Sequence, residues 1–373
     1  MNPKKLLGLA AAAVVVLVLG FWIAGRQNST QTEAEGLVYP DLKSQVGKVD
    51  TVRIYKAGDA RAVELRRKDD AWTVTERGGY PADVSKLRTL LRSLTEAKLF
   101  EEKTSTPENY PSLGVDDVRK PDARGVRIEI PGTKPPVDLI VGKSGPGAQS
   151  QYVRRVGEPK SWLVSASIEV SATPESWIRK EITDVSADRV QSASVTVNSA
   201  KPYNAAKKTR ADANFVVDSL PKGKELSSDS AANGIATALA GLTLSDVQQA
   251  SSFDAGPPSA HTTIRTFDGL VADLDGWTRN DKHYVSVKAS FDQALADQFK
   301  QPAAAAKDEK KDTDAAKKDD KAQAEGKTTA KTANVSEEAN TINARVSGWI
   351  YEIPQYKYDA IFKPLEQLLK KDK

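Results

Sequence analysis

Two halves of the chain carry the same short apolar motifs in the same order, and this internal repeat constrains the fold most. Val52-Arg53-Ile54 is followed by Trp72-Thr73-Val74, and the second half repeats them at an offset of 143 residues as Val195-Thr196-Val197 and Phe215-Val216-Val217. Alternation of apolar and polar residues is typical of a strand with one buried face. The repeat therefore predicts two related β-rich domains.

Further strand-like runs continue this order. In the first half they are Val126/Ile128/Ile130, Val137/Leu139/Val141, Tyr152-Val153-Arg154 and Trp162-Leu163-Val164. In the second half they are Thr262-Thr263-Ile264, Leu270/Ala272/Leu274, Tyr284-Val285 and Trp349-Ile350-Tyr351. Gly276 is expected to turn the chain after the second of these, and Trp177-Ile178 and Ile361-Phe362 give each half a short apolar end.

Each half also carries one helical stripe. Asp83 is a suitable N-cap for a stripe that comprises Val84, Leu87, Leu90, Leu91 and Leu94. The second stripe follows Ser228-Asp229 and comprises Ile235, Leu239 and Leu242. We therefore expect an α+β fold with two repeats, 49–185 and 186–373, each with antiparallel strands and a packed amphipathic helix.

The N-terminal segment predicts a membrane anchor. Leu6 to Gly25 is a run of 20 uncharged residues, long enough to cross a hydrocarbon core of about 30 Å. Lys4 and Lys5 precede it, which places the N-terminus in the cytoplasm and the bulk of the chain outside. We interpret 1–26 as a single transmembrane signal anchor and 27–48 as a juxtamembrane linker. A cleaved secretory signal is the alternative.

A low-complexity insert is expected at 302–341, between the strand at Tyr284 and the strand at Trp349. From Pro302 to Thr341 there are eight Lys, nine Asp or Glu, no aromatic residue and one large aliphatic residue, Val335. Such a composition favours disorder because little apolar surface is available to offset the ordering entropy. A charged solvent-exposed helix is the alternative, since Ala, Lys and Glu favour helices.

The composition argues against most catalytic chemistry. The chain has no cysteine, which excludes disulfides, thiol nucleophiles and cysteine-based metal sites, and it has only two histidines. The 54 Lys and Arg against 50 Asp and Glu leave a net charge of +4, a weak field that gives no case for nucleic acid. We predict no enzyme activity, no catalytic, cofactor-binding or metal-binding residues, and no cofactor.

Individual motifs support this interpretation. Gly142-Lys143-Ser144 resembles the end of a phosphate-binding loop, but the earlier glycine is replaced by Val137 and Gly145-Pro146-Gly147 follows, so a turn is expected. His261 and His283 are expected on different strands without paired carboxylates. Asp116-Asp117 is interpreted as a cap or turn. The tryptophans are expected mainly in the core, with a sugar-stacking role open for one or two.

The order of Gly142-Lys143-Ser144, Gln151-Tyr152-Val153-Arg154-Arg155 and Ser161-Trp162-Leu163-Val164-Ser165 resembles an uncharacterised bacterial "domain of unknown function" family. The resemblance covers most of 37–300 and resumes at Trp349. It implies one transmembrane helix, repeated β-rich units, and association with ABC transporter components of the gliding-motility type, including the GldG-like auxiliary subunit. It implies no catalytic residues, and the low-complexity insert departs from the usual pattern.

Together these observations predict a noncatalytic accessory subunit in the bacterial inner membrane, with one span and its bulk in the periplasm. Its partner is expected to be an ABC transporter permease or auxiliary subunit, bound through exposed strand edges. A module that binds cell-envelope glycan or peptidoglycan is the alternative. The oligomeric state does not follow from the sequence.

Overall fold

A computed structural model describes residues 36–147, 149–198, 200–218, 220–254, 256–299 and 334–371. These residues form a mixed helix and strand structure that consists mostly of β-sheet, as the α+β prediction requires in its coarse form. The chain divides into two compact units after Trp177, except that Arg77–Tyr80 groups with the second unit. The repeat pattern placed this boundary after Val185, but β10 (Glu181–Thr183) pairs with β14 (Leu242–Thr243) inside the second unit.

The first unit is built on an open sheet that follows the predicted strands. Its strands are β1 (Thr51–Lys56), β2 (Ala60–Lys68), β3 (Ala71–Val74), β4 (Tyr80–Pro81), β5 (Leu99–Thr104), β6 (Val126–Ile130), β7 (Val137–Ser144), β8 (Gln151–Arg155) and β9 (Ser161–Val164). Their order is β4-β3-β2-β1-β6-β7-β8-β9-β5. Val63, Ile54, Ile128 and Leu139 stand opposite one another across four strands and are fully buried.

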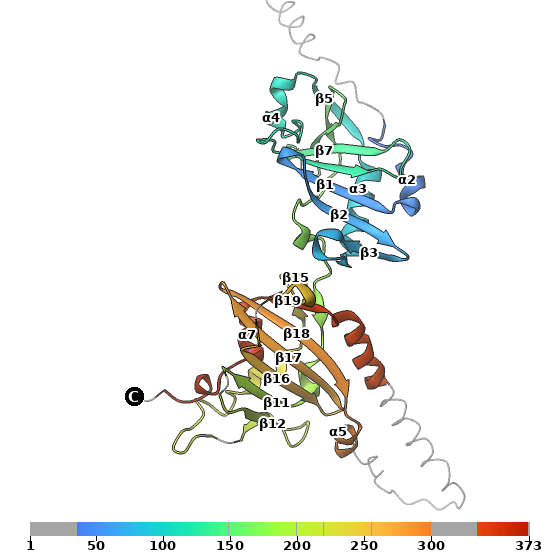
Figure 1. Ribbon diagram of the computed structural model, residues 1–373. Coiled ribbons are helices and arrows are strands. Elements are labelled where there is room, and N and C mark those ends of the chain that lie inside the picture. The colour runs from blue at the N-terminus through green and yellow to red at the C-terminus, as the bar shows by residue number, and fades with distance from the viewer. Residues whose placement is uncertain are drawn as a thin grey trace, which may run out of the picture. The chain divides into compact units, whose positions relative to one another are not determined.

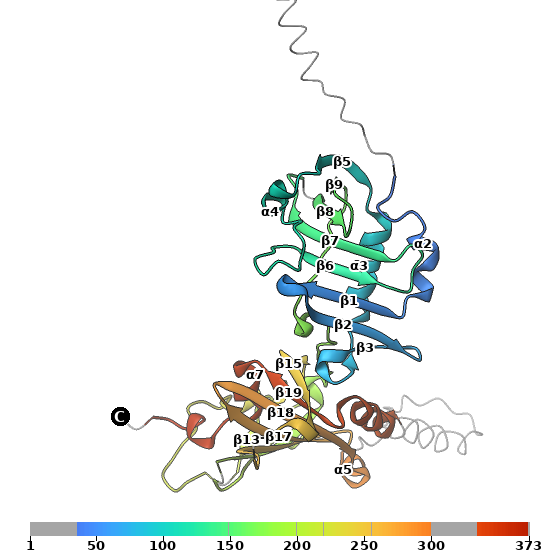
Figure 2. The ribbon, with the colours of Figure 1, turned by 45° about the horizontal axis from the view of Figure 1, so that its top comes forward.

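Helix α3 (Val84–Glu96) lies against this sheet (Figure 1, Figure 2). The Asp83 carboxylate caps it by accepting a hydrogen bond from the Lys86 backbone N–H at 3.0 Å, as the sequence predicts. Its predicted apolar stripe is buried: Leu87, Leu90, Leu91 and Leu94. Four leucines of this kind contribute about 6–12 kcal/mol of burial free energy, before the entropic cost of ordering the chain is subtracted.

The predicted juxtamembrane linker 27–48 is wrong over the part that the structure describes. Val38 and Leu42 are each 2% exposed, and α2 (Leu42–Gln45) contacts α3. The Tyr39 hydroxyl accepts a hydrogen bond from the Asp138 backbone N–H at 3.0 Å, and burial raises the pKa of Tyr39 to about 12. Three apolar side chains within five residues are enough to fold this segment into the first unit.

The expected anchor from Leu6 to Gly25 lies outside the described residues. In the ranges that the structure covers, no helix combines the length and apolar character that a membrane span requires. The transmembrane segment therefore stays a prediction from the sequence.

The second unit contains a sheet with a corresponding strand order. Its strands are β11 (Val190–Val197), β12 (Tyr203–Ala206), β13 (Val216–Val217), β15 (Asp246–Gln249), β16 (Ala260–Thr266), β17 (Leu270–Arg279), β18 (Lys282–Phe291) and β19 (Trp349–Ile353). Their order is β13-β12-β11-β16-β17-β18-β19-β15. Apart from β4, which has no counterpart in the second sheet, replacing β1, β2 and β3 by β11, β12 and β13, and β5 to β9 by β15 to β19, converts the first order into the second.

The second predicted amphipathic helix is wrong. Asn233–Thr237 forms a 3-10 helix, η7, without a side-chain cap, and Leu242 belongs to β14. Gly234 costs about 1 kcal/mol in a helix interior relative to Ala, and Gly241 has a left-handed φ of 52°, so an α-helix does not extend across this stretch. The buried face of the sheet is covered instead by α7 (Gln355–Ile361) and Phe362, with the Thr262 hydroxyl donating to the Ile361 carbonyl at 2.8 Å.

The sequence suggested a turn at Gly276, but this residue lies within β17. A Cβ placed on Gly276 would stand 2.6 Å from the Phe362 ring, so this position is glycine because the ring packs directly on the backbone. The turn follows at Asn280 and Asp281, both with positive φ.

The expected insert 302–341 is wrong at its C-terminal end, because residues 334–346 form a helix. Four buried residues follow a helical spacing, and two of them lie beyond the end of the expected insert: Val335, Ala339, Ile342 and Val346. The Asn343 side-chain amide exchanges hydrogen bonds of 2.8 and 2.6 Å with the backbone of Ala289. Residues 302–333 of the expected insert lie outside the described residues.

Arg189 ties this helix to the second sheet. Its guanidinium bonds the Glu338 carboxylate at 2.7 and 2.8 Å and the Asp268 carboxylate at 3.0 Å. Burial alone would raise the pKa of Asp268, but the Thr266 hydroxyl and the Arg189 charge outweigh it and hold that pKa below its usual value. Ionised Asp268 therefore stabilises the folded state.

We expect Asp268→Asn to lower the free energy of unfolding at pH 7 by about 2 kcal/mol, since it removes the charge on a partly buried hydrogen-bonded pair. Because the folded pKa is lowered, the wild-type contribution is present above the unfolded aspartate pKa near 4 and is lost as the pH falls below it. Urea unfolding at pH 7 and pH 3 measures this. The difference between wild type and variant should shrink at pH 3, and the exposed control Asp229→Asn should show no such change. An equal difference at both pH values would contradict this account.

Candidate functional site

The motif Gly142-Lys143-Ser144 lies in β7 rather than in the turn that we expected. A Cβ on Gly142 would stand 2.4 Å from the Leu113 carbonyl oxygen, at the end of α4 (Tyr110–Leu113). The Lys143 ammonium donates to the Ser112 carbonyl at 2.7 Å. The motif therefore holds the segment after β5 against the sheet, where Tyr110, Val115, Val118 and Ile140 form a small buried cluster. This is a structural role, and it does not resemble phosphate binding.

The sequence suggested that His261 has no paired carboxylate, but the structure places one beside it. Its Nδ1 lies 2.8 Å from an Asp275 carboxylate oxygen on the neighbouring strand, because β16 and β17 set the two residues directly opposite each other. Its Nε2 lies 3.3 Å from the Thr263 hydroxyl. Period-two spacing along one strand, combined with cross-strand pairing, is the signal that sequence reasoning missed.

Asp275, His261 and Thr263 touch one another in the same sequence of side chains as an acyl-transfer triad. Their protons, however, are not arranged as in such a triad. The Thr263 hydroxyl donates to the Asp273 carboxylate at 2.6 Å, a shorter contact than the one to His261. His261 and Asp275 are 48% and 42% exposed, so water screens their interaction. The arrangement is therefore a surface hydrogen-bond network on the polar face of the second sheet.

The remaining candidate residues are structural as well. The His283 ring stacks on Tyr358 with centroids 4.7 Å apart. Arg119 bonds the Asp117 carboxylate and holds the pKa of Asp117 at about 2, while Asp116 is 1% exposed. Across the described ranges, no group of three or more His, Asp or Glu side chains could hold a metal ion.

Three of the tryptophans make the ring contacts or burial expected of core residues. Trp177 is fully buried, Trp349 packs edge-on against Tyr80 at 5.0 Å, and Trp277 packs edge-on against Phe253 at 5.4 Å. These contacts occupy ring faces or edges that a sugar would otherwise meet.

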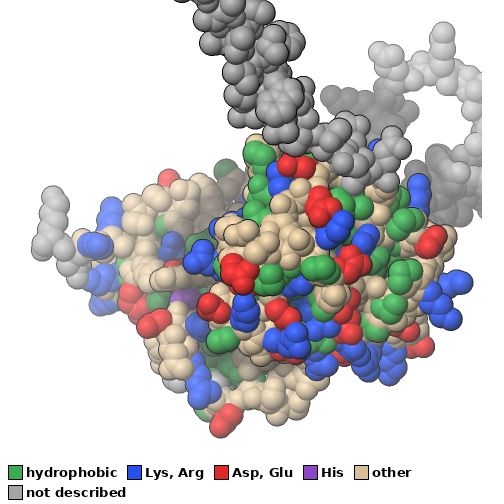
Figure 3. All heavy atoms as spheres, turned by 90° about the horizontal axis from the view of Figure 1, so that it is seen from above, with side chains coloured by type: hydrophobic (Ala, Val, Ile, Leu, Met, Phe, Trp, Pro, Cys, Tyr) green, Lys and Arg blue, Asp and Glu red, His purple; other side chains and the backbone are tan. Residues whose placement is uncertain are grey.

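The charged face of the first sheet is extensively paired. The Glu64 carboxylate, on a residue only 2% exposed, lies 2.9 to 3.1 Å from the guanidinium groups of Arg53, Arg61 and Arg66. Burial alone would raise the pKa of Glu64, but the Arg53 hydrogen bond and the neighbouring arginine charges lower it. Figure 3 shows acidic and basic side chains interspersed over the face in view. Such a surface gives no single-sign field for steering a charged ligand.

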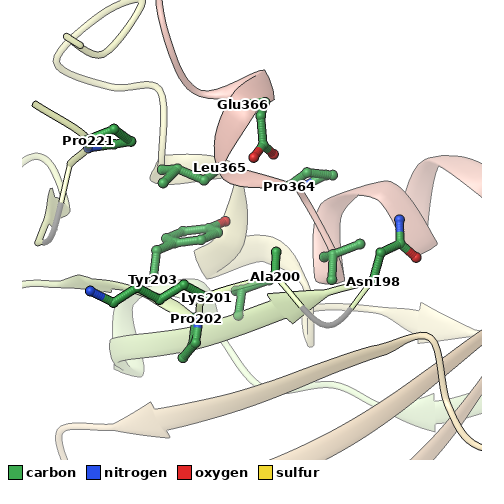
Figure 4. A pocket seen from close by; sticks show the side chains of 11 residues that line it. Asn198, Ala200, Lys201, Pro202, Tyr203, Pro221, Pro364, Leu365 and Glu366 are labelled. Carbon is green, nitrogen blue, oxygen red and sulfur yellow. The ribbon is translucent and has the colours of Figure 1, made fainter. Parts of the chain in front are cut away.

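A cavity of about 440 Å³ lies in the second unit, between the start of β12 and the segment after α7. The Tyr203 ring forms one wall (Figure 4). The Tyr203 hydroxyl donates to the Lys363 carbonyl at 2.7 Å. Burial raises the pKa of this hydroxyl. Pro202, Pro221 and Pro364 add apolar surface, and polar side chains are limited to Asn198, Lys201 and Glu366. The cavity can accept a small, partly polar group but offers no catalytic pair.

The edge strand β5 of the first sheet is the clearest candidate for an interaction site. Among the described residues, its sheet partner is β9, and only the bridge from Leu37 to Lys98 touches the opposite side at its start. Phe100 is 49% exposed on this strand. Glu101 and Glu102 are paired with Lys103 and Lys160, at 2.5 and 2.9 Å. Free backbone groups on such an edge can pair with an extended segment.

Comparison with known proteins gives a family. Residues 72–262, just over half of the chain, match a family model described as "Domain of unknown function (DUF4340)". The chain belongs to this family. No curated protein and no solved structure matches it. The coarse resemblance to a domain-of-unknown-function family is thus confirmed, and its link to ABC transporter components stays a prediction.

The DUF4340 match runs from β3 to β16 and so spans the junction of the two units. It includes α3, β5 and β9 of the first sheet, and it ends before β17, β18 and β19 of the second. The edge strand β5 and its neighbour β9 therefore lie within the residues that match the family model. His261 lies at the end of this match, and Asp275 lies outside it.

We expect Gly142→Ala to lower the free energy of unfolding by about 2–3 kcal/mol, because the new methyl group meets a backbone oxygen that cannot move independently. Urea unfolding of the DUF4340 chain measures this. Gly47→Ala is the control, since Gly47 has no neighbour within 4 Å of a new Cβ, and it should change stability by less than about 0.5 kcal/mol. Similar losses in both variants would contradict the close approach at Gly142.

We expect His261→Ala to leave ester hydrolysis at the background rate of the wild-type chain, because the Thr263 proton is directed to Asp273. Initial rates with p-nitrophenyl acetate and p-nitrophenyl butyrate measure this. Stability should change by less than about 1 kcal/mol, as is usual for an exposed pair. A wild-type rate above that of free imidazole, lost in His261→Ala and in Thr263→Val, would instead establish catalysis.

Proposed function

We propose that the protein is a noncatalytic, membrane-anchored periplasmic accessory subunit that acts through protein–protein contacts, with an ABC-type transport system as its partner. One span at Leu6 to Gly25 anchors it in the bacterial inner membrane, with the N-terminus in the cytoplasm. The motifs that most resembled chemistry, around Gly142 and His261, have structural explanations that support this proposal.

The exposed β5 edge carries the proposal. A strand edge with an exposed phenylalanine is unfavourable in a soluble domain unless it is protected or used, and the paired charges beside Phe100 protect it only in part. DUF4340 membership and the resemblance to GldG-like transporter components favour a protein as the molecule that uses it. Eleven peptide steps separate Gly25 from Gly36, so the first unit lies within about 40 Å of the proposed anchor.

A glycan- or peptidoglycan-binding module is the second candidate. The cavity beside Tyr203 favours it, since it combines an aromatic ring with Asn198, Lys201 and Glu366 at its border. The tryptophan contacts described above weigh against it, because a sugar would need an open ring face.

One experiment separates the two candidates. The intact chain is cross-linked in its native membranes, extracted in mild detergent and captured, and the recovered proteins are identified by mass spectrometry. We expect an ABC permease and its ATPase in stoichiometric amounts. Capture of wall fragments without a transporter would favour the glycan module, and capture of the chain alone would count against both. A chain lacking residues 37–373 is the control and should recover no transporter.

A further inference from the structure

We propose that the cavity beside Tyr203 binds a small zwitterionic ligand with an apolar body, namely a free amino acid or a short peptide. The ammonium group of this ligand pairs with Glu366, and its carboxylate pairs with Lys201. Such a site needs no transporter, so it is independent of the function proposed above. Three features of the cavity support it: braced walls, an apolar lining and two charges without partners.

The walls of the cavity are held by hydrogen bonds between segments far apart in the sequence. The Tyr203 hydroxyl donates to the Lys363 carbonyl at 2.7 Å, which ties the start of β12 to the segment after α7. The backbone N–H of Ser227 donates to the Leu368 carbonyl at 2.8 Å. Between these two contacts lies the 3-10 helix η9 (Leu365–Gln367), whose first two residues line the cavity. The cavity is therefore largely formed before a ligand arrives, as sites for small molecules usually are.

The lining of the cavity is mainly apolar and suits the body of a small ligand. In Figure 4 the Tyr203 ring lies among Leu365 and three prolines, Pro202, Pro221 and Pro364. Proline has no backbone N–H, so these three positions present apolar rings without a donor. A hydrophobic side chain gains more from this lining than a sugar, whose many hydroxyl groups need hydrogen-bond partners when they leave water.

Two opposite charges line this cavity and have no partners of their own. Lys201 lies just before β12 and Glu366 lies in η9, and Figure 4 shows them on opposite sides of the Tyr203 ring. Among the residues that the structure describes, neither side chain takes part in an ion pair or a hydrogen bond. Exposure alone does not explain this, since Lys370 and Glu225 pair at 2.6 Å although they are 62% and 73% exposed. A ligand that carries both charges satisfies Lys201 and Glu366 together.

The position of Glu366 relative to the cavity wall is visible in its effect on Tyr203. Burial raises the pKa of the Tyr203 hydroxyl, and the negative charge of Glu366 raises it further. The carboxylate is therefore close to the wall as well as to solvent. Asn198 lines the same cavity at a left-handed φ of 51°, with its backbone N–H bonded to the Ser259 carbonyl at 2.7 Å. Its side-chain amide offers both a donor and an acceptor to a peptide group.

Ligands with charge of only one sign fit this cavity less well. A phosphate would meet the Glu366 carboxylate without compensation, and a polyamine would meet the Lys201 ammonium in the same way. Because Lys201 and Glu366 are both exposed, water screens their charges and the binding is weak. We expect a dissociation constant on the order of 1 mM for a dipeptide.

Ligand-observed NMR on the full chain in detergent tests the site. The probe is L-alanyl-L-leucine, and saturation transfer from the protein to its leucine methyl groups is measured as the dipeptide is titrated. The N-acetyl form of the dipeptide lacks the ammonium group, and the C-terminal amide lacks the carboxylate. We expect each blocked form to bind about fivefold more weakly than the free dipeptide, as is reasonable for one exposed charge pair.

Matched variants assign the two charges. Glu366→Gln should weaken binding of the free dipeptide about fivefold and leave binding of the N-acetyl form unchanged. Lys201→Gln should do the same for the free dipeptide and leave binding of the amide unchanged. The controls Glu108→Gln and Lys56→Gln, on exposed residues of the first unit, should bind as wild type does.

Absence of saturation transfer to the dipeptide, or equal binding of its three forms by wild type, would overturn the inference. Binding of N,N′-diacetylchitobiose in place of the dipeptide would also overturn it and would assign the cavity to a glycan. No transporter is present in these titrations. Their failure therefore leaves the proposed accessory role intact, and failure of the membrane capture leaves the ligand site intact.

Discussion

The apolar face of an open antiparallel sheet must be covered before the sheet is stable, and both units depend on how that face is covered. In the first unit a capped α-helix supplies four leucines, so most of the cover comes from one contiguous segment. In the second unit the cover comes from η7, α7 and Phe362, which are separated by most of the sheet in sequence. The second unit therefore closes more long-range contacts before its sheet is buried, and we expect it to be the slower of the two to fold.

The strands could be predicted from the sequence because their signal is local. Alternation at Val52, Ile54 and Val195 needs no knowledge of the partner strand, and the structure places all three in paired strands. The second helix could not be predicted correctly, since its apolar spacing was helical while Gly234 and Gly241 favoured other backbone conformations. The helix at 334–346 was missed for the opposite reason. Its buried face combines Val335 and Ala339 with Ile342 and Val346, and the last two lie beyond the low-complexity stretch in which the aliphatic residues were counted.

Contacts between strands were the second limit on prediction. The pairing of His261 with Asp275 depends on the register of β16 with β17, and a sequence alone does not fix that register. The reason for Gly142 depends on Leu113, which approaches from a separate segment. In both cases the residue type was noticed but its neighbour was not. Residues that matter through their neighbours are thus the ones that single-sequence reasoning assigns least well.

The difference between the two edge strands follows from the repeat itself. Two copies of one sheet can keep the same buried alternation while their edges change freely, because edge residues contribute little to the core. Gln249 and Glu102 occupy equivalent places, yet one donates a hydrogen bond to a segment of its own chain and the other presents a half-exposed carboxylate. A substitution from amide to carboxylate costs little on an exposed edge and reverses the chemistry that the edge can recognise. The two equivalent edges therefore present different chemistry without any change in the sheet that supports them.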